Sequence, residues 1–519
     1  MGCVVAIDAG TTGVRALVVD EQAEVVDLAY RELTQYYPRP GWVEHDPTEI
    51  WDAVRATLAE VGARLAESSN TVAAIGVTNQ RETVIAFDRT SGQPLHRAIV
   101  WQDRRTAAIC TAMIEAGHLP TIRARTGLVL DPYFSASKMT YLLRHADLTI
   151  GPGLSFGTVD SWVLWNLTGG KDGGVFVTDP SNASRTMLLD TASLSWSPEL
   201  CALFEVPITT LPEVRPSAGR IGTVNASELG LGPAGHVFAG VPVSAILGDQ
   251  QAALFGQACF DPGMVKVTYG TGSFALAHAG SDRPDAPDGL IVSVAWDLHT
   301  YAGSRPAISY ALEGSTFVSG AAIQWLRDGL GLIGAAPEIG PLAESVPDSG
   351  GVTFVPALTG LGSPWWDPTA RGIITGITRG AGRAQIARAC VEAMAFQVRD
   401  MTDAMAAASA HHLSTLRADG GAAAMDLLLQ LQAEQSRMPV ARPRSLESTA
   451  LGAATLAGLA EGMWGSLDDL AALWSASATF EPELPVELTD AVYAVWRRAV
   501  ERAQGWAQPD DGTPSPPEE

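Results

Sequence analysis

Short runs of apolar residues, bounded by glycine, proline or polar residues, recur along the chain and predict buried β-strands. These runs lie at residues 4–7, 14–19, 72–78, 97–101, 243–247, 264–268, 352–356 and 413–418. Several of them end in clusters of polar residues, such as residues 79–83 and 102–105. Polar residues at strand ends are what an open α/β sheet uses to bind ligands.

Between the strands, other segments show the spacing of amphipathic helices. The first begins at Asp46-Pro47, with Asp46 as the cap and Pro47 in the first turn. Apolar residues then recur at helical spacing, at Ile50, Val54, Leu58, Val61 and Leu65. A second apolar face is formed by Val391, Met394, Val398, Met401 and Met405. Residues 450–460 are mostly small and suit a helix packed closely on its neighbours. This alternation predicts an α/β fold.

One local pattern occurs twice. A strand, a Gly/Thr turn and a second strand occupy residues 4–19, and the same arrangement returns at residues 264–274. Between them lies the stretch 248–256, in which Asp249 follows a glycine that lets another group approach the backbone. Because 519 residues are too many for one hydrophobic core, we expect two domains, at residues 1–256 and 257–507. Residues 508–519 are rich in proline and acid and predict a disordered tail.

Charge and composition narrow the class of protein. Acidic residues outnumber basic ones 57 to 34, which gives a net charge of −23 and argues against a nucleic-acid partner. The sequence has no apolar run long enough for a membrane span and no signal segment, so membrane insertion is not expected. Its five cysteines are far apart and are expected to be reduced thiols. These features predict a cytoplasmic protein.

The two Gly/Thr turns are candidate phosphate sites. Such a turn offers backbone N–H groups and hydroxyls, and an arginine adds a charged fork. Residues 10–13 with Arg15 fit this description, as do residues 270–272. Either one alone could be an ordinary turn. Two copies, with Asp8 and Asp249 as nearby acids, suggest a two-domain clamp for ATP.

Two alternatives remain open for the charged candidates. Asp249 could be a catalytic carboxylate, or it could cap the helix that follows it. Arg81-Glu82 could contact a substrate, or the two residues could form a surface ion pair.

Taken together, the motifs of residues 4–506 resemble those of the FGGY family of carbohydrate kinases. The matching segments are IDAGTT (7–12), PGWVEHDP (40–47), NQRET (79–83), IVWQ (99–102), DPYFS (131–135), NASRTM (182–187), GDQQAALFG (248–256), YGTG (269–272), IQWL (323–326), GLGSPWWD (360–367) and DGG (419–421). Within the family, the motifs are most similar to those of members that phosphorylate glycerol.

The resemblance implies an α/β fold of two ribonuclease-H-like (actin-like ATPase) domains flanking a central cleft. It implies transfer of phosphate from ATP to glycerol, with Asp249 as the general base and Asp8 holding Mg²⁺ through water. The residues implied in glycerol binding are Arg81, Glu82, Trp101, Tyr133, Asp249, Gln250 and Phe274. Those implied in nucleotide binding are Thr11, Thr12, Gly13, Arg15, Thr271, Gly272, Gly320, Gln324, Gly421 and Met425. A homo-oligomer, dimer or tetramer, is also expected.

The chain departs from its relatives at two of these positions. Gly13 stands where relatives often have Ser, and Met425 stands where many have an Asn near the adenine. Two other functions remain as alternatives. One is a kinase of the same family for another polyol or a ketose. The other is an actin- or chaperone-like nucleotide switch, which would turn over ATP without a small polyol.

Overall fold

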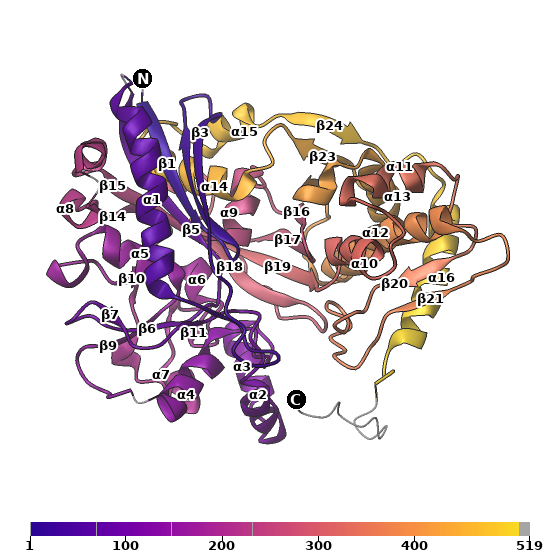
Figure 1. Ribbon diagram of the computed structural model, residues 1–519, viewed down its shortest axis with the longest axis horizontal. Helices are drawn as coiled ribbons and strands as arrows, with labels where there is room; N and C mark the ends of the chain where they lie inside the picture. The colour runs from indigo at the N-terminus through magenta and orange to yellow at the C-terminus, as the bar shows by residue number, and fades with distance from the viewer. Residues whose placement is uncertain (1, 69, 147, 231, 508–519) are drawn as a thin grey trace.

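Two β-sheets, one from each half of the chain, organise the molecule (Figure 1). The computed structural model describes residues 2–68, 70–146, 148–230 and 232–507. The first sheet contains, in spatial order, β14 (Ala218–Thr223), β15 (Pro242–Gly248), β5 (Thr71–Asn79), β1 (Gly2–Ala9), β2 (Gly13–Val19) and β3 (Val25–Glu32). The second contains β18 (Ile291–Asp297), β19 (Ile308–Thr316), β17 (Ser273–Gly280), β16 (Met264–Tyr269), β22 (Thr415–Asp419), β23 (Val440–Pro443) and β24 (Ala476–Phe480).

Both sheets share one five-strand plan. In the first, β1 and β2 form an antiparallel hairpin, β3 pairs antiparallel with β2, and β5 and β15 continue parallel to β1. In the second, β16, β17, β19, β22 and β23 repeat these positions and directions. The turn motif that recurs in the sequence is therefore the first hairpin of each sheet. This repeat agrees with the predicted pair of ribonuclease-H-like domains.

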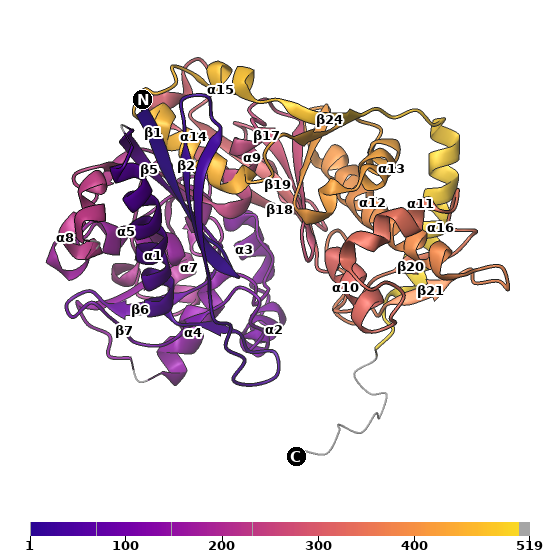
Figure 2. The same cartoon turned by 45° about the horizontal axis from the view of Figure 1, so that its top comes forward.

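Both faces of the first sheet are covered, which explains why its strands are continuously apolar. Alternate residues of β1 point to opposite sides: Val5 and Ile7 pack with α1 (Pro47–Ala66) and α5 (Val159–Leu167). Val4 and Ala6 pack with α9 (Asp249–Gly256) and α14 (Ser448–Ala460). The same core includes Leu276 of β17, so α9 and α14 join the two sheets (Figure 2).

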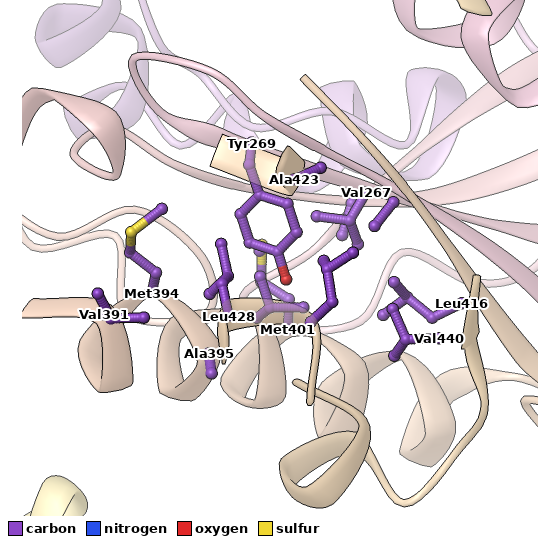
Figure 3. Packing of buried hydrophobic residues seen from close by; sticks show 14 of the residues in the cluster. Val267, Tyr269, Val391, Met394, Ala395, Met401, Leu416, Ala423, Leu428 and Val440 are labelled. Atoms are coloured by element: carbon purple, nitrogen blue, oxygen red, sulfur yellow. The ribbon is translucent and has the colours of Figure 1, made fainter. Parts of the chain in front are cut away.

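The second sheet packs on helices from the second half of the chain. Val267 and Tyr269 of β16 meet Met394 and Met401 of α12 (Arg383–Ala408) in a shared core (Figure 3). The same core includes apolar residues of α10 (Gly320–Asp328) and α13 (Asp426–Ser436). α16 (Val486–Ala503) lies at the outer edge of this half (Figure 1).

The remaining elements form smaller structures around the two sheets. The strands are β4 (Glu44–His45), β6 (Ile85–Asp88), β7 (Gln93–Pro94), β8 (Ala98–Ile99), β9 (Leu154–Gly157), β10 (Val177–Thr178), β11 (Leu189–Asp190), β12 (Ser195–Trp196), β13 (Glu213–Val214), β20 (Thr353–Val355) and β21 (Ile373–Thr375). The helices are α2 (Ala107–Glu115), α3 (Leu119–Thr126), α4 (Ser135–His145), α6 (Pro180–Ala183), α7 (Pro198–Leu203), α8 (Ala226–Leu229), α11 (Ile339–Glu344) and α15 (Leu467–Leu473).

Most predicted elements are present. The run at residues 97–101, however, forms only the two-residue strand β8. The division of the chain at residue 256 stays a prediction, and α14, from the second half, lies against the first sheet. The predicted tail at residues 508–519 falls outside the described residues. Within the described ranges, no helix is long and apolar enough to cross a membrane.

Candidate active site

The predicted site residues gather at the carboxyl ends of parallel strands in both sheets, as ligand sites of α/β folds do. In the first sheet, Asp8 lies near the end of β1, Arg81 and Glu82 follow β5, and Asp249 follows β15. In the second, the turn at residues 270–272 follows β16 and Gly421 follows β22. Parallel pairing brings these strand ends together at one edge of each sheet.

The first Gly/Thr turn is closed by its own backbone. The N–H of Gly10 donates to the carbonyl of Gly13 over 3.0 Å. Thr12 is exposed, whereas the hydroxyl of Thr11 accepts a 2.9 Å hydrogen bond from the indole N–H of Trp101. This bond links a residue expected at the phosphates with one expected at the polyol.

The second turn repeats this closure and packs on α10. The N–H of Gly270 donates to the carbonyl of Gly272 over 2.9 Å, and Thr271 is exposed. The N–H of Gly320 donates to the carbonyl of Gly270 over 3.0 Å. A Cβ on Gly320 would lie 2.6 Å from that carbonyl oxygen, so glycine is required for this approach. The turn and the start of α10 therefore form one unit.

The neighbouring ring of Tyr30 explains why position 13 is a glycine. A Cβ at position 13 would lie 2.4 Å from the Tyr30 ring, whose hydroxyl donates to the carbonyl of Thr12 over 3.2 Å. The ring occupies the space into which a serine side chain at this position would project.

We expect Gly13→Ser to turn Tyr30 outward and break its hydrogen bond to Thr12, because the half-exposed ring is freer to move than the backbone. Losing one neutral hydrogen bond costs about 0.5–1.5 kcal/mol. Thermal unfolding should show a small drop for Gly13→Ser. In the Tyr30→Ala background the serine should cost less, and an equal cost in both backgrounds would contradict this explanation.

Asp8 is a buried acid with weak pairing. Arg15 approaches its carboxylate at 3.5 Å and also lies 3.4 Å from Glu447, at the start of α14. Burial raises the pKa of Asp8 to about 7, against the lowering effect of Arg15, and the nearby Asp249 adds to the rise. The negative charge of the Asp8 carboxylate is therefore only partly balanced by Arg15.

Asp249 begins α9, directly after β15. The N-cap residue of α9 is Gly248, which makes no side-chain cap, so Asp249 is the first residue of the helix and not its N-cap. Its carboxylate accepts from the first-turn N–H of Gln250 over 2.7 Å. Its carboxylate lies 3.1 Å from Nε of Arg81, and its side chain is 28% exposed. Burial raises its pKa, although Arg81 and Lys266 lower it.

Arg81 and Glu82 are both 2% exposed, so they are not a surface pair. Each contacts a charged residue that the sequence analysis did not assign to the site. The Nη1 and Nη2 atoms of Arg81 donate to the carboxylate of Glu313, on β19, over 2.8 and 2.9 Å. Nε of Arg185 donates to Glu82 over 2.6 Å. Arg185 also donates to Glu313 from both terminal nitrogens, over 3.1 Å each.

Three aromatic rings form one group beside these charges. The ring centroid of Trp101 lies 5.5 Å from that of Tyr133 and 6.4 Å from that of Phe274, in edge-to-face arrangements. Arg185 lies over the Tyr133 ring at 5.5 Å. The structure thus assembles the predicted apolar wall from both halves of the chain.

Gln250 contacts a buried lysine, Lys266, which the sequence analysis also did not assign to the site. The ammonium of Lys266 donates to the Gln250 side-chain oxygen. Lys266 lies on β16, and burial lowers its pKa while Asp419 and Asp249 raise it. Asp419, at the end of β22, accepts from Thr268 and, over 2.9 Å, from Gln257.

The residues predicted to meet the nucleoside lie around α10 and α13. Gln324 is an exposed residue of α10, and a Cβ on Gly421 would meet nothing within 4 Å. Met425 precedes α13 and lies against Gly340. Asp426 is held by Arg442, whose Nη1 donates to it over 2.8 Å.

Comparison with known proteins identifies the family. The model of the FGGY family of carbohydrate kinases matches residues 3–256 with its N-terminal domain and residues 265–461 with its C-terminal domain. The chain belongs to the FGGY family of carbohydrate kinases. This confirms the family resemblance found in the sequence and the predicted fold class.

Individual members of the FGGY family are similar over nearly their full length. A glycerol kinase of Aromatoleum aromaticum is 50% identical, across 98% of this chain and 99% of that protein. A glycerol kinase of Gloeobacter violaceus is also 50% identical, across 98% of each chain. Among solved structures, Plasmodium falciparum glycerol kinase with ADP superimposes with a TM-score of 0.89 at 32% identity, covering 97% of this chain and 98% of that one.

Three residues of this FGGY site went unassigned in the sequence, although each left a signal. Arg185 lies inside the motif at residues 182–187. Lys266 and Glu313 are charged residues within apolar strand sequences, and charges are almost never fully buried unless paired. A charge inside a buried strand could therefore have been taken as a sign of a partner elsewhere in the chain.

Proposed function

We propose that this chain transfers the γ-phosphate of ATP to glycerol and forms sn-glycerol 3-phosphate. The observation that carries the proposal is the position of Asp249. Its carboxylate contacts Arg81, beside Glu82 and the aromatic wall, in a chain 50% identical to glycerol kinases over almost its whole length. The kinase class follows from the family.

Glycerol carries three hydroxyls on a short carbon chain, so a buried site must pair each hydroxyl while covering the carbons. Arg81, Glu82, Asp249 and Gln250 supply charged and amide groups for the hydroxyls. Trp101, Tyr133 and Phe274 supply apolar surface for the carbons. Because hydrogen bonds to charged partners are the strongest, this set suits a small polyol.

Asp249 acts as the general base. Its carboxylate takes the proton of the reacting hydroxyl as that oxygen bonds to the γ-phosphorus, and the bond from phosphorus to the bridging oxygen of ADP breaks. The burial that raises its pKa makes it a stronger base than an exposed aspartate. Arg81 orients the carboxylate through Nε.

The two Gly/Thr turns bind the phosphates. Thr11, Thr12, Gly13 and Arg15 contact them from the first sheet, and Thr271 and Gly272 from the second. Gly320, Gln324, Gly421 and Met425 surround the nucleoside.

Asp8 fits the Mg²⁺ that accompanies ATP, because it is a buried, weakly paired carboxylate, and oxygen ligands suit this ion. Within the described ranges, no cluster of three or more His, Cys, Asp or Glu side chains could hold a metal by itself. Magnesium ions in kinases are usually bound by one or two carboxylates together with water and substrate phosphates, so a single carboxylate is enough. When bound, the ion would neutralise phosphate charge.

The experiment is a coupled assay with ATP, Mg²⁺ and glycerol. Turnover that requires glycerol supports the proposal. A xylulose kinase of Rhodospirillum rubrum shares the fold, with a TM-score of 0.84 and 25% identity across 96% of this chain and 98% of that one. A panel of polyols and ketoses therefore tests the nearest alternative. ATP turnover without any polyol would instead favour a nucleotide switch.

The side chain at position 425 is expected to affect the preference for ATP over GTP. A thioether offers mainly dispersion contact to a purine, whereas Asn could donate and accept hydrogen bonds. We expect Met425→Asn to raise the kcat/KM ratio of ATP over GTP by about two- to tenfold, the effect of one neutral hydrogen bond.

The control for this prediction is Asp426→Ala, because Asp426 could supply the contact if the register shifts by one residue. Nη1 of Arg442 donates to Asp426 over 2.8 Å, so Asp426 would have to leave this ion pair to contact the purine. An ATP/GTP ratio unchanged in Met425→Asn but collapsed in Asp426→Ala would contradict this expectation.

A cytoplasmic location and assembly into a dimer or tetramer also belong to the proposal. The five cysteines are free and buried, which suits a reducing compartment. Mass measurement of the purified protein in solution tests the assembly.

A further inference from the structure

We propose that Glu313 is a positioning residue of the polyol site. Its carboxylate, supplied by the second sheet, holds the guanidinium of Arg81 in the orientation in which Arg81 meets the substrate. This inference rests on the proposed function, because it assigns a role within the same site.

Glu313 fixes Arg81 at two of its three nitrogens. Nη1 and Nη2 donate to the two oxygens of Glu313 over 2.8 and 2.9 Å, while Nε faces Asp249 at 3.1 Å. A planar guanidinium held at two nitrogens by a carboxylate has little freedom left to rotate. Glu313 therefore determines which edge of Arg81 faces Asp249.

Arg185 makes Glu313 a shared acceptor. Its terminal nitrogens donate to the same two oxygens over 3.1 Å each, and its Nε donates to Glu82 over 2.6 Å. Glu313 and Arg185 have no solvent exposure, and Arg81 has 2%. One carboxylate thus aligns the two arginines that contact Asp249 and Glu82.

The local charge balance predicts what happens without Glu313. The cations around it are Arg81, Arg185 and Lys266, and the other anions are Glu82 and Asp249. If Glu313 becomes neutral, Asp249 is the nearest carboxylate left to Arg81. The guanidinium would then turn onto Asp249 and leave the orientation that suits the polyol.

The contacts also cross between the two halves of the chain. Arg81 and Arg185 follow elements of the first half, whereas Glu313 lies in β19 of the second sheet, 232 and 128 residues away. The polyol site is complete only while β19 lies against the loops of the first half. Glycerol affinity should therefore depend on Glu313, although the residue belongs to the opposite half.

The test uses the full-length protein with Glu313→Gln, Glu313→Asp and a matched control, Glu461→Gln. Glu461 also accepts an arginine fork, from Arg220, but it lies at the end of α14 and outside the site. KM for glycerol and KM for ATP are measured separately. Calorimetric titration of glycerol without ATP gives affinity independently of turnover, and circular dichroism establishes folding.

We expect Glu313→Gln to raise KM and Kd for glycerol by about 10- to 100-fold, the effect of losing hydrogen bonds to a charged partner. KM for ATP should change less than about twofold, because the phosphate turns are intact. Glu313→Asp keeps the charge but is one methylene shorter, so it should show a smaller rise. Glu461→Gln should leave both KM values unchanged.

Two results would overturn the inference. One is a wild-type KM for glycerol in folded Glu313→Gln, or in Glu313→Asp if Glu313→Gln does not fold. The other is an equal rise in both KM values, which would indicate a general structural role. Failure of the proposed function is distinct, because the wild-type protein itself would then show no glycerol-dependent turnover.

Discussion

Asp249→Asn is expected to fold normally and to lose about 10²–10⁴-fold in turnover, the usual contribution of a positioned general base. The amide has the same size and can still lie beside Arg81, but it cannot take the proton of the reacting hydroxyl. The loss should appear in kcat, because glycerol and ATP retain their other contacts. The coupled assay with purified, folded variant measures it.

The matched control is Asp46→Asn, at the cap of α1 and outside the site. Asparagine caps helices about as well as aspartate, so turnover should be unchanged. The pH profile adds a second test. Because burial raises the pKa of Asp249, wild-type activity should fall as pH drops through a value above the ordinary range for aspartate. The Asn variant should lack this acidic limb, and near-normal turnover would remove Asp249 from the role of base.

The strands and hairpins could be predicted because their signals are local. β1 and β16 are apolar runs that break into Gly/Thr turns, and the turn chemistry marks both hairpins. The first helix was marked by Asp46, which caps α1 by accepting from the N–H of Thr48. Each of these features is contained within a few residues of sequence.

The position of α14 could not be predicted in this way. Its composition of small residues indicated close packing but not against which element. In the structure it crosses α9, and a Cβ on Gly452 would lie 1.8 Å from the carbonyl oxygen of Ala252. This approach joins residues about 200 positions apart, so only the folded chain shows that α14 packs on the first sheet.

The same distinction applies to the site. Asp249 and Arg81 stand next to glycine or at strand ends, in motifs that could be recognised locally. Glu313 and Lys266 lie inside strands, and their roles depend on partners brought close by folding. The charged groups that touch the predicted substrate residues were therefore found only from the structure.

Among the substitutions proposed for this protein, Arg185→Met is expected to cause the largest loss of stability. Arg185 is the shared partner of Glu82 and Glu313, and its removal leaves two buried carboxylates with one remaining arginine, Arg81. Breaking a buried pair by removing one partner costs about 3–5 kcal/mol. For a chain of 519 residues, the melting temperature should fall by roughly 3–5 °C. The surface arginine Arg144, paired with Glu205 in the open, is the control, and Arg144→Met should cost about 0–1 kcal/mol.

The loss should depend on pH in a defined direction. Burial alone would raise the pKa of Glu313, but Arg185 and Arg81 outweigh it and lower the pKa from 4.5 to about 2. A carboxylate with a lowered pKa stabilises the fold above its unfolded pKa, and this stability is lost as pH falls toward the folded value. Without Arg185, Glu313 should take up a proton at higher pH, which relieves the unpaired charge. The gap in melting temperature between wild type and Arg185→Met should therefore be widest at neutral pH and narrow toward about pH 4. A gap that stays constant over this range would show that Arg185 stabilises the protein by packing rather than by its charge.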